Sequence, residues 1–165
     1  MNKYITTSYK KTQKLGENFA QEILALRQAQ GKNNSAVVFG LSGNLGGGKT
    51  TFLQGFAKGL GIKEKILSPT FVVMKKFKIP TTNKLQPTSY FYHFDCYRFE
   101  RAEDILDLGW KDIISNPINI VAVEWPDKIK KVLPKDMIKI DFKFIDKTKR
   151  EIKFDSNFRK NIIGL

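Results

Sequence analysis

The chain has 165 residues, of which 41% are hydrophobic and 27% charged, the ordinary balance of a water-soluble globular protein. This length predicts one domain over residues 1–165, and no apolar run approaches the roughly 18 residues that a membrane span needs. The formal net charge of +13 favours contact with nucleic acid or another polyanion, but lysine scattered along the chain is equally typical of codon drift in an AT-rich genome.

Cysteine and histidine each occur once, as Cys96 and His93. An internal disulfide is therefore excluded, as are zinc sites built from several Cys and His side chains. The first residues, MNKYITTSYKK, have neither the apolar core nor the small-residue cleavage site of a secretory signal. These features together predict a cytoplasmic protein.

The first half of the chain predicts alternating strands and helices. A short strand at residues 4–7 precedes a helix whose apolar residues recur at helical spacing from Leu15 to Leu26, with Thr7 or Ser8 as its cap. The apolar run at residues 35–43 is typical of a buried strand. A glycine-rich loop follows it, and then a helix that ends near Gly59 and Gly61.

The second half predicts more strands than helices. Residues 71–79 and 90–99 are β-rich runs on either side of a polar loop, which indicates an antiparallel hairpin. Residues 102–110 indicate a short acidic helix, and residues 118–125 a central strand. Residues 137–146 alternate, with Ile138, Ile140, Phe142 and Phe144 on one side, and lead through a turn to a strand at 151–155. The order predicts an α/β fold, with a mostly parallel sheet flanked by helices and antiparallel strands at the edges.

The glycine-rich loop matches the phosphate-binding pattern G-x-x-x-x-G-K-[ST] at Gly43, Gly48, Lys49 and Thr50. An apolar run precedes it and an apolar helix follows, which is the context that this P-loop motif requires. Glycines allow backbone N–H groups to converge on phosphate oxygens at a helix N-terminus. Lys49 is then expected to bind the β- and γ-phosphates, and the Thr50 hydroxyl to bind Mg²⁺.

A P-loop needs a second acid at the end of a neighbouring strand to hold Mg²⁺ or to orient water. Glu124 ends one apolar strand, and Asp95 lies within another β-rich run, where alternation places it on one face with His93 and Tyr97. Their alternatives are an exposed acid at a strand end for Glu124 and a salt bridge to Arg98 for Asp95. His93 is either a hydrogen-bonded structural residue or a base.

The nucleotide is predicted to be ATP rather than GTP. A guanine-specific protein carries N-K-x-D, whereas the nearest match here, Asn83-Lys84-Leu85-Gln86, ends in glutamine and comes too early. Two other readings of the P-loop stay open. One is a small-molecule kinase with Asp95 as its base, and the other is a nucleotide-binding module without turnover.

Several motifs occur together and in order: LSGNLGGGKTTF at 41–52, SPTF at 68–71, HFDCYR at 93–98, EDILDLGW at 103–110 and VEWPD at 123–127. In this combination the chain resembles the bacterial TsaE family of small P-loop ATPases, and the resemblance extends from about Thr12 to the final strands. Departures are small, such as Asn44 and Gly47 where aspartate and alanine are usual.

The resemblance implies a set of site residues. Catalytic roles fall to Lys49, Asp95 and Glu124, with Asp95 close to the γ-phosphate, and Mg²⁺ is held by Thr50 and Glu124. A switch-like segment at 68–70 and the nucleotide-reporting Trp125 complete the site. The residues implied to bind ATP are Thr12, Asn44, Leu45, Gly46, Gly47, Gly48, Lys49, Thr50 and Thr51.

The resemblance also implies a role in making threonylcarbamoyladenosine, abbreviated t6A, at adenosine 37 of tRNAs that read ANN codons. In that family the ATPase is an accessory to the TsaD–TsaB pair, which transfers the threonylcarbamoyl group. The expected activity is a weak Mg²⁺-dependent ATPase that the partners stimulate. The implied partners are TsaD and TsaB, with contact to tRNA through the complex.

Overall fold

The computed structural model describes residues 2–29, 34–67, 72–81 and 88–155. Seven strands form one sheet in the order β1-β7-β6-β2-β5-β4-β3. Their bounds are Asn2–Thr6 (β1), Val37–Ser42 (β2), Met74–Lys78 (β3), Tyr90–Asp95 (β4), Ile120–Glu124 (β5), Ile138–Phe144 (β6) and Arg150–Phe154 (β7). The helical elements are Tyr9–Ala29 (α1), Lys49–Gly59 (α2), Ala102–Leu108 (η1), Trp110–Ser115 (α3) and Pro126–Val132 (η2).

The central strands are parallel and the edges are antiparallel. Strand β2 pairs in parallel with β5 and β6, and β5 pairs in parallel with β4. Strands β7 and β1 extend one edge antiparallel, and β3 extends the other. This confirms the predicted α/β fold with antiparallel additions, including the hairpin of β3 with β4 and that of β6 with β7.

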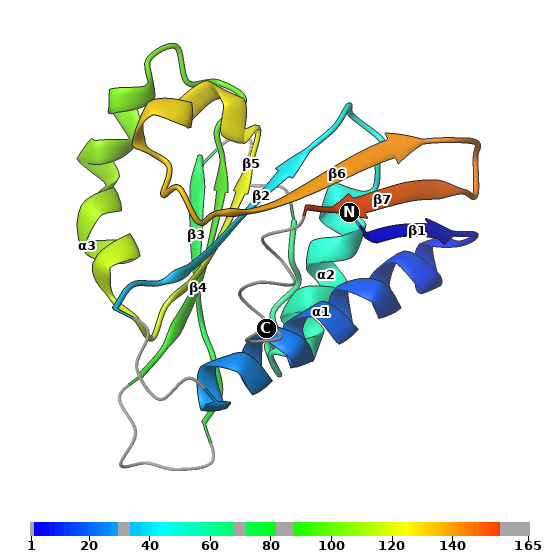
Figure 1. Cartoon of the computed structure of the whole chain (residues 1–165), viewed down its shortest axis with the longest axis horizontal. Coiled ribbons are helices and arrows are strands. Elements are labelled where there is room, and N and C mark those ends of the chain that lie inside the picture. Colours follow the sequence, from blue (N-terminus) through cyan, green and yellow to red (C-terminus); the bar gives the residue numbers. More distant parts are fainter. Residues whose placement is uncertain (1, 30–33, 68–71, 82–87, 156–165) are drawn as a thin grey trace.

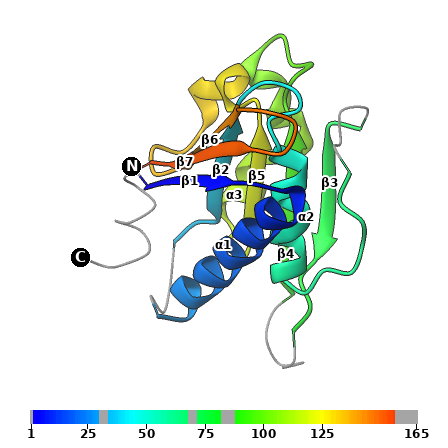
Figure 2. The same cartoon turned by 90° about the vertical axis from the view of Figure 1, so that its right-hand side faces the viewer.

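Helical elements cover the two faces of the sheet, as Figures 1 and 2 show for α3 on one side and for α1 and α2 on the other. One core lies beneath α1 and α2 and is rich in phenylalanine, including Phe39, Phe52 and Phe56. The other lies beneath η1, α3 and η2, around Phe94 and Trp110. Because both faces are covered, every residue of β5 is buried, as its unbroken apolar run predicts.

Helices α1 and α2 pack very closely because both carry glycine at the contact. A Cβ atom on Gly16 would overlap the Phe52 carbonyl oxygen, and one on Gly55 would overlap that of Gln13. The Ser8 hydroxyl accepts a hydrogen bond from the Lys11 amide at 3.2 Å, which confirms Ser8 as a cap of α1. None of the described helices is both long and apolar enough to cross a membrane.

Three details differ from the sequence-based expectation. The acidic helix at 102–110 is a 3-10 helix, η1, that stops at Gly109 (φ 75°) and continues as α3. A further 3-10 helix, η2, follows Trp125, where no helix was predicted. Phe144 continues the alternation of Ile138, Ile140 and Phe142 but is not buried with them: its side chain is 51% exposed at the end of β6, where Arg150 covers its ring.

Candidate functional site

The glycine-rich loop connects the end of β2 to the start of α2. Gly43 has φ 127°, and a Cβ there would overlap the Phe142 carbonyl oxygen on the neighbouring β6. Gly48, at φ 99°, is the N-cap of α2. Both positions require glycine because L side chains rarely adopt such φ values. The loop thus brings residues without a Cβ to the N-terminus of α2, the end of a helix that favours anions.

Lys49, the first residue of α2, lies in the wall of this loop. Its Nζ donates hydrogen bonds to the carbonyl oxygens of Gly43 (2.6 Å) and Asn44 (3.1 Å), and it lies 4.9 Å from the centre of the Trp125 ring. Burial lowers the pKa of Lys49, while the carboxylates of Glu124 and Asp95 oppose that shift. The lysine is therefore a largely desolvated cation beside the loop, held by contacts that a phosphate could replace.

The two predicted acids come together at the carboxyl ends of adjacent parallel strands. Asp95 of β4 is paired in register with Glu124 of β5, and both side chains are buried. The Asp95 carboxylate accepts a hydrogen bond from the Tyr97 amide at 3.0 Å. Glu124 Oε1 lies 2.9 Å from Nε2 of His93. The expectation of an exposed strand-end acid at Glu124 therefore does not apply, because both acids face a shared site beside Lys49.

A cavity of about 570 Å³ joins the loop to the acids, a volume typical of ligand pockets. Its lining contains most of the residues that the sequence analysis selected. These are Thr12, Leu45, Gly46, Gly47, Gly48, Lys49, Thr50, Thr51, Asp95, Glu124 and Trp125. Asn44 is not part of this lining and instead contributes its carbonyl oxygen to Lys49. The switch-like segment at 68–70 lies outside the described residues.

Thr12 reaches the pocket in an unexpected way. Its hydroxyl is 2.7 Å from that of Thr6 and 3.3 Å from the Ser8 carbonyl oxygen, so the hydroxyl is already engaged within the protein. Its methyl carbon would lie 3.7 Å from a Cβ placed on Gly48. Thr12 therefore packs against the loop through its methyl group and ties β1 to α1 through its hydroxyl.

Five pocket residues were missed by the sequence analysis: Tyr9, Tyr97, Lys147, Thr148 and Arg150. Lys147 and Thr148 come from the turn between β6 and β7, and Arg150 is the first residue of β7. The sequence predicts this turn, but it contains no signal that the turn folds against a loop about a hundred residues earlier. Only the strand order, which places β6 next to β2, brings the two together.

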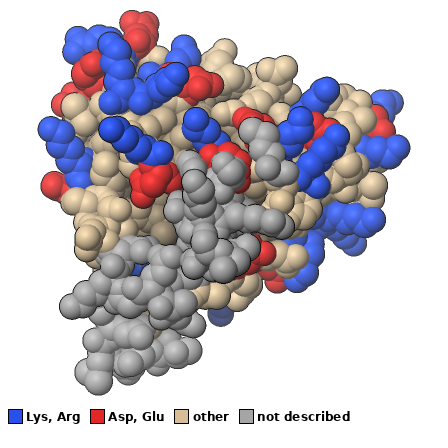
Figure 3. All heavy atoms as spheres, in the orientation of Figure 1, with Lys and Arg blue, Asp and Glu red and all other residues tan. Residues whose placement is uncertain are grey.

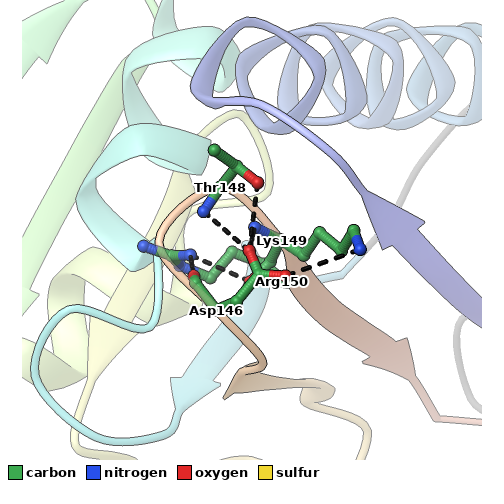
Figure 4. A network of polar contacts seen from close by, with 4 residues as sticks. All are labelled: Asp146, Thr148, Lys149 and Arg150. Carbon is green, nitrogen blue, oxygen red and sulfur yellow. Dashed lines mark hydrogen bonds and ion pairs between the residues drawn. The ribbon is translucent and has the colours of Figure 1, made fainter.

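The β6–β7 turn is held by a network of polar contacts (Figure 4). Asp146 Oδ1 accepts hydrogen bonds from the amides of Thr148 and Lys149, both at 2.8 Å, and these bonds lower the pKa of Asp146 to about 2. Arg150 donates from Nη1 to the Asp146 carbonyl (2.6 Å) and from Nε to the Gly46 carbonyl (3.0 Å). The arginine thereby fastens the turn to the phosphate-binding loop.

The arginine that lines the pocket is not one that lies near the acids in sequence. Arg98 and Arg101 are nearest to the acids in sequence, yet neither belongs to the pocket lining, whereas Arg150 does. Arg101 lies at the start of η1 and forms an exposed ion pair with Asp104 at 3.8 Å. Proximity along the chain is a poor guide here because the chain leaves the pocket after Tyr97 and enters η1.

The donor set suits Mg²⁺ and a nucleotide. Glu124, Asp95 and Thr50 offer carboxylate and hydroxyl oxygens, the hard ligands that Mg²⁺ prefers. The described residues contain no cluster of three side chains that would bind a metal by themselves. A magnesium ion here would complete its coordination with phosphate oxygens and water, as is usual for this ion.

Comparison with known proteins agrees with the motifs. Residues 6–152 match the family model described as threonylcarbamoyl adenosine biosynthesis protein TsaE. The tRNA threonylcarbamoyladenosine biosynthesis protein TsaE of Rickettsia typhi is 33% identical over 144 residues, covering 87% of each chain. The protein of the same name from Bacillus subtilis is 38% identical over 117 residues, covering 71% of this chain and 68% of that one.

A solved structure supports the same assignment. The crystal structure of Bacillus subtilis YdiB superimposes with a TM-score of 0.67 at 25% sequence identity and covers 99% of this chain and 92% of that one. The residues matched by the family model, 6–152, include the glycine-rich loop and both acids. The chain therefore belongs to the TsaE family of tRNA threonylcarbamoyladenosine biosynthesis proteins.

Proposed function

We propose that this protein is a Mg²⁺-dependent ATPase that supports formation of t6A at adenosine 37 of tRNAs reading ANN codons, together with the TsaD–TsaB complex. The observation that carries the ATPase proposal is one pocket in which the P-loop, Lys49, Asp95 and Glu124 meet. The role in t6A formation rests on membership of the TsaE family. TsaD and TsaB are proposed as partners on the family resemblance.

The pocket residues divide naturally into roles. Lys49 exchanges the loop carbonyls for the β- and γ-phosphates, and the loop amides bind the remaining phosphate oxygens. Thr50 and Glu124 would hold Mg²⁺, and the bound ion would neutralise part of the phosphate charge. Asp95, buried next to Glu124, orients the attacking water. The hydrogen bond from the Tyr97 amide keeps the Asp95 carboxylate in place.

The kinase alternative is weakened by the position of residues 101–118. Small-molecule kinases close an arginine-bearing lid over the phosphates. Here η1 and α3 instead pack on the face of the sheet opposite α2, where Ile105 and Trp110 are buried in a separate core. Arg101, in this segment, does not line the pocket. These described residues offer no lid for an acceptor substrate.

Steady-state phosphate release with TsaD–TsaB titrated in tests the proposal. We expect roughly 10⁻³ to 10⁻² s⁻¹ for the protein by itself, because unassisted P-loop hydrolysis is slow, and a higher rate with the pair. Lys49→Ala is the control. It should abolish ATP turnover both with and without the TsaD–TsaB pair, while its circular dichroism spectrum stays native. A rate near 10 s⁻¹ without partners, or one that is indifferent to them, would contradict the accessory role.

A further inference from the structure

His93 and Glu124 form a buried pair behind the candidate metal site. His93 lies on β4, where it is paired in register with Ala122 of β5, two residues before Glu124. Its side chain therefore lies on the same sheet face as that of Glu124. His93 is completely buried, Glu124 is 3% exposed, and their Nε2 and Oε1 atoms are 2.9 Å apart. This contact is close enough to fix the orientation of the carboxylate.

The surroundings of the His93 imidazole indicate which ring nitrogen carries a proton. Nδ1 is buried and has no hydrogen-bond partner among the described residues. On one side the ring stacks on Phe91, with 6.5 Å between ring centres and 11° between ring planes. A proton on Nδ1 would leave a buried N–H group unpaired, which is costly, whereas a proton on Nε2 has the Glu124 carboxylate as its acceptor. The geometry thus favours a proton on Nε2, where the ring donates it to Glu124 Oε1.

We propose that His93 is a positioning residue for Glu124: its Nε2–H group holds Oε1 and leaves Oε2 as the carboxylate oxygen for the metal. This inference rests on the proposed function, because it assigns the partner of the metal-binding acid. Groups that hydrogen-bond a metal ligand from outside the coordination shell commonly set its orientation and basicity. His93 is not part of the pocket wall that the described residues form, so a role as a base that touches substrate is not supported.

The tautomer can be measured directly because His93 is the only histidine of the chain. Protein labelled with ¹⁵N-histidine gives one pair of ring nitrogen signals, and the long-range ¹H–¹⁵N spectrum at pH 8 reports which nitrogen carries the proton. We expect the Nε2–H tautomer in the wild type, and a loss of that preference in Glu124→Ala. A wild-type ring protonated at Nδ1 would overturn the proposal.

Two variants of matched polarity test the positioning role. The side-chain amide nitrogen of His93→Gln reaches the place of Nε2, whereas that of His93→Asn reaches the place of Nδ1. A fluorescent ADP analogue is titrated with and without Mn²⁺ as the metal probe. Without metal, we expect the wild type and both variants to bind the analogue with equal affinity. Mn²⁺ is expected to increase the affinity for the analogue, and the measured quantity is the Mn²⁺ concentration that gives half of this increase. That concentration should rise about tenfold to hundredfold in the Asn variant and stay near the wild-type value in the Gln variant.

The outcomes separate a positioning role from simple packing. An Asn variant with wild-type Mn²⁺ dependence would overturn the proposal, and so would equal losses in the Asn and Gln variants. Thermal unfolding of each variant shows whether it is folded, and the tautomer measurement needs no variant for its main result. If wild-type protein fails to bind the nucleotide, the proposed function fails, while the spectrum of the metal-free protein still decides the His93–Glu124 contact.

Discussion

Asp95 and Glu124 are paired residues of neighbouring strands, yet their side chains have different partners. The Asp95 carboxylate is bound by the Tyr97 amide just beyond its own strand, whereas Glu124 is bound by His93 of the adjacent strand. Trp125, directly after Glu124, adopts φ 58°, which is uncommon for a residue other than glycine, and its ring lies beside Lys49 Nζ. Local contacts of this kind give two similar acids different surroundings.

We therefore expect the two acids to respond differently to truncation. Glu124→Ala should weaken Mg²⁺-dependent nucleotide binding about tenfold to hundredfold and leave Mg²⁺-free binding nearly unchanged. Asp95→Ala should keep nucleotide and Mg²⁺ binding and slow hydrolysis by about a hundredfold or more. Nucleotide titration and phosphate release check both, with Asp107→Ala, an exposed acid of η1, as the control. Equal loss of binding in both acid variants would contradict this division.

Among the elements, α1 and α2 determine how well the loop is supported, because α2 begins with Lys49 at the pocket and packs along α1. The contact is made by backbone as well as side chains, since glycine occupies positions 16 and 55. Gly16 ends the sequence TQKLG at residues 12–16, and Thr12, one helical turn before it, lines the pocket. The segment therefore serves the site through helix packing in addition to its contact with the loop.

Gly55→Ala should destabilise the protein by about 1–3 kcal/mol. Alanine gains about 1 kcal/mol of helix propensity over glycine, but its Cβ would overlap the Gln13 backbone, and such overpacking costs more than that gain. Urea unfolding measures the difference in the free energy of unfolding between the variant and the wild type. Lys58→Ala, exposed on the same helix, should stay within about 0.5 kcal/mol of wild type. A Gly55→Ala protein as stable as wild type would show that the helices can separate without cost.

The edge strand β1 is attached to β7 partly through Glu151, which lies between Lys3 at 2.6 Å and Lys153 at 3.1 Å. Hydrogen bonds from these lysines lower the pKa of Glu151 to about 2, below its ordinary value of 4.5. The stabilisation from this carboxylate is thus complete above pH 4.5 and is lost as the pH falls through about 2. Because β1 also carries Thr6, its attachment affects the support of Thr12 in the pocket.

Acidification should accordingly loosen β1. We expect amide exchange in Asn2–Thr6 to quicken more than in β5 between pH 4.5 and pH 2, after correction for the intrinsic exchange rates. Glu151→Gln should show weaker β1 protection at pH 7 and less change on acidification. Exchange followed by mass spectrometry measures both, and an identical pH response in the variant would assign the effect to other groups.

At the scale of the whole molecule, the excess of positive charge is spread out. On the face shown in Figure 3, lysine and arginine side chains are interspersed with aspartate and glutamate over several elements. The pocket itself combines Lys49, Lys147 and Arg150 with two buried acids. An excess of positive charge distributed in this way attracts polyanions in general.

We expect weak RNA binding by the isolated protein that depends on salt and not on sequence. Its affinity for a tRNA that reads ANN codons and for an unrelated tRNA should be equal. Both should fall at least tenfold between 50 and 200 mM salt, because phosphate contacts release counterions. Fluorescence anisotropy measures the two series. A clear preference for the ANN-reading tRNA would show that the protein itself contributes to recognition.

The sequence by itself determined the parts of this protein that depend on neighbours along the chain. The glycine-rich loop, its flanking strand and helix, and the strand ending in Glu124 follow from local patterns. The β-rich run around Asp95 was also predicted, but its end at Asp95 was not, because the pattern continues to residue 99. Apolar runs and alternation report burial on one or both faces, so the α/β fold could be predicted as well. The order of the motifs was enough to indicate the TsaE family.

The tertiary structure decided what depends on strand order and side-chain contact. Because β6 lies next to β2, the β6–β7 turn and Arg150 reach the loop, whereas Arg101 does not line the pocket. Because β4 lies next to β5, His93 meets Glu124 across 31 positions of sequence. Phe144 is exposed even though the alternation continues to it, since the core beneath β6 ends before the strand does. Such contacts join segments far apart in the chain, and periodicity within one segment carries no information about its neighbour in space.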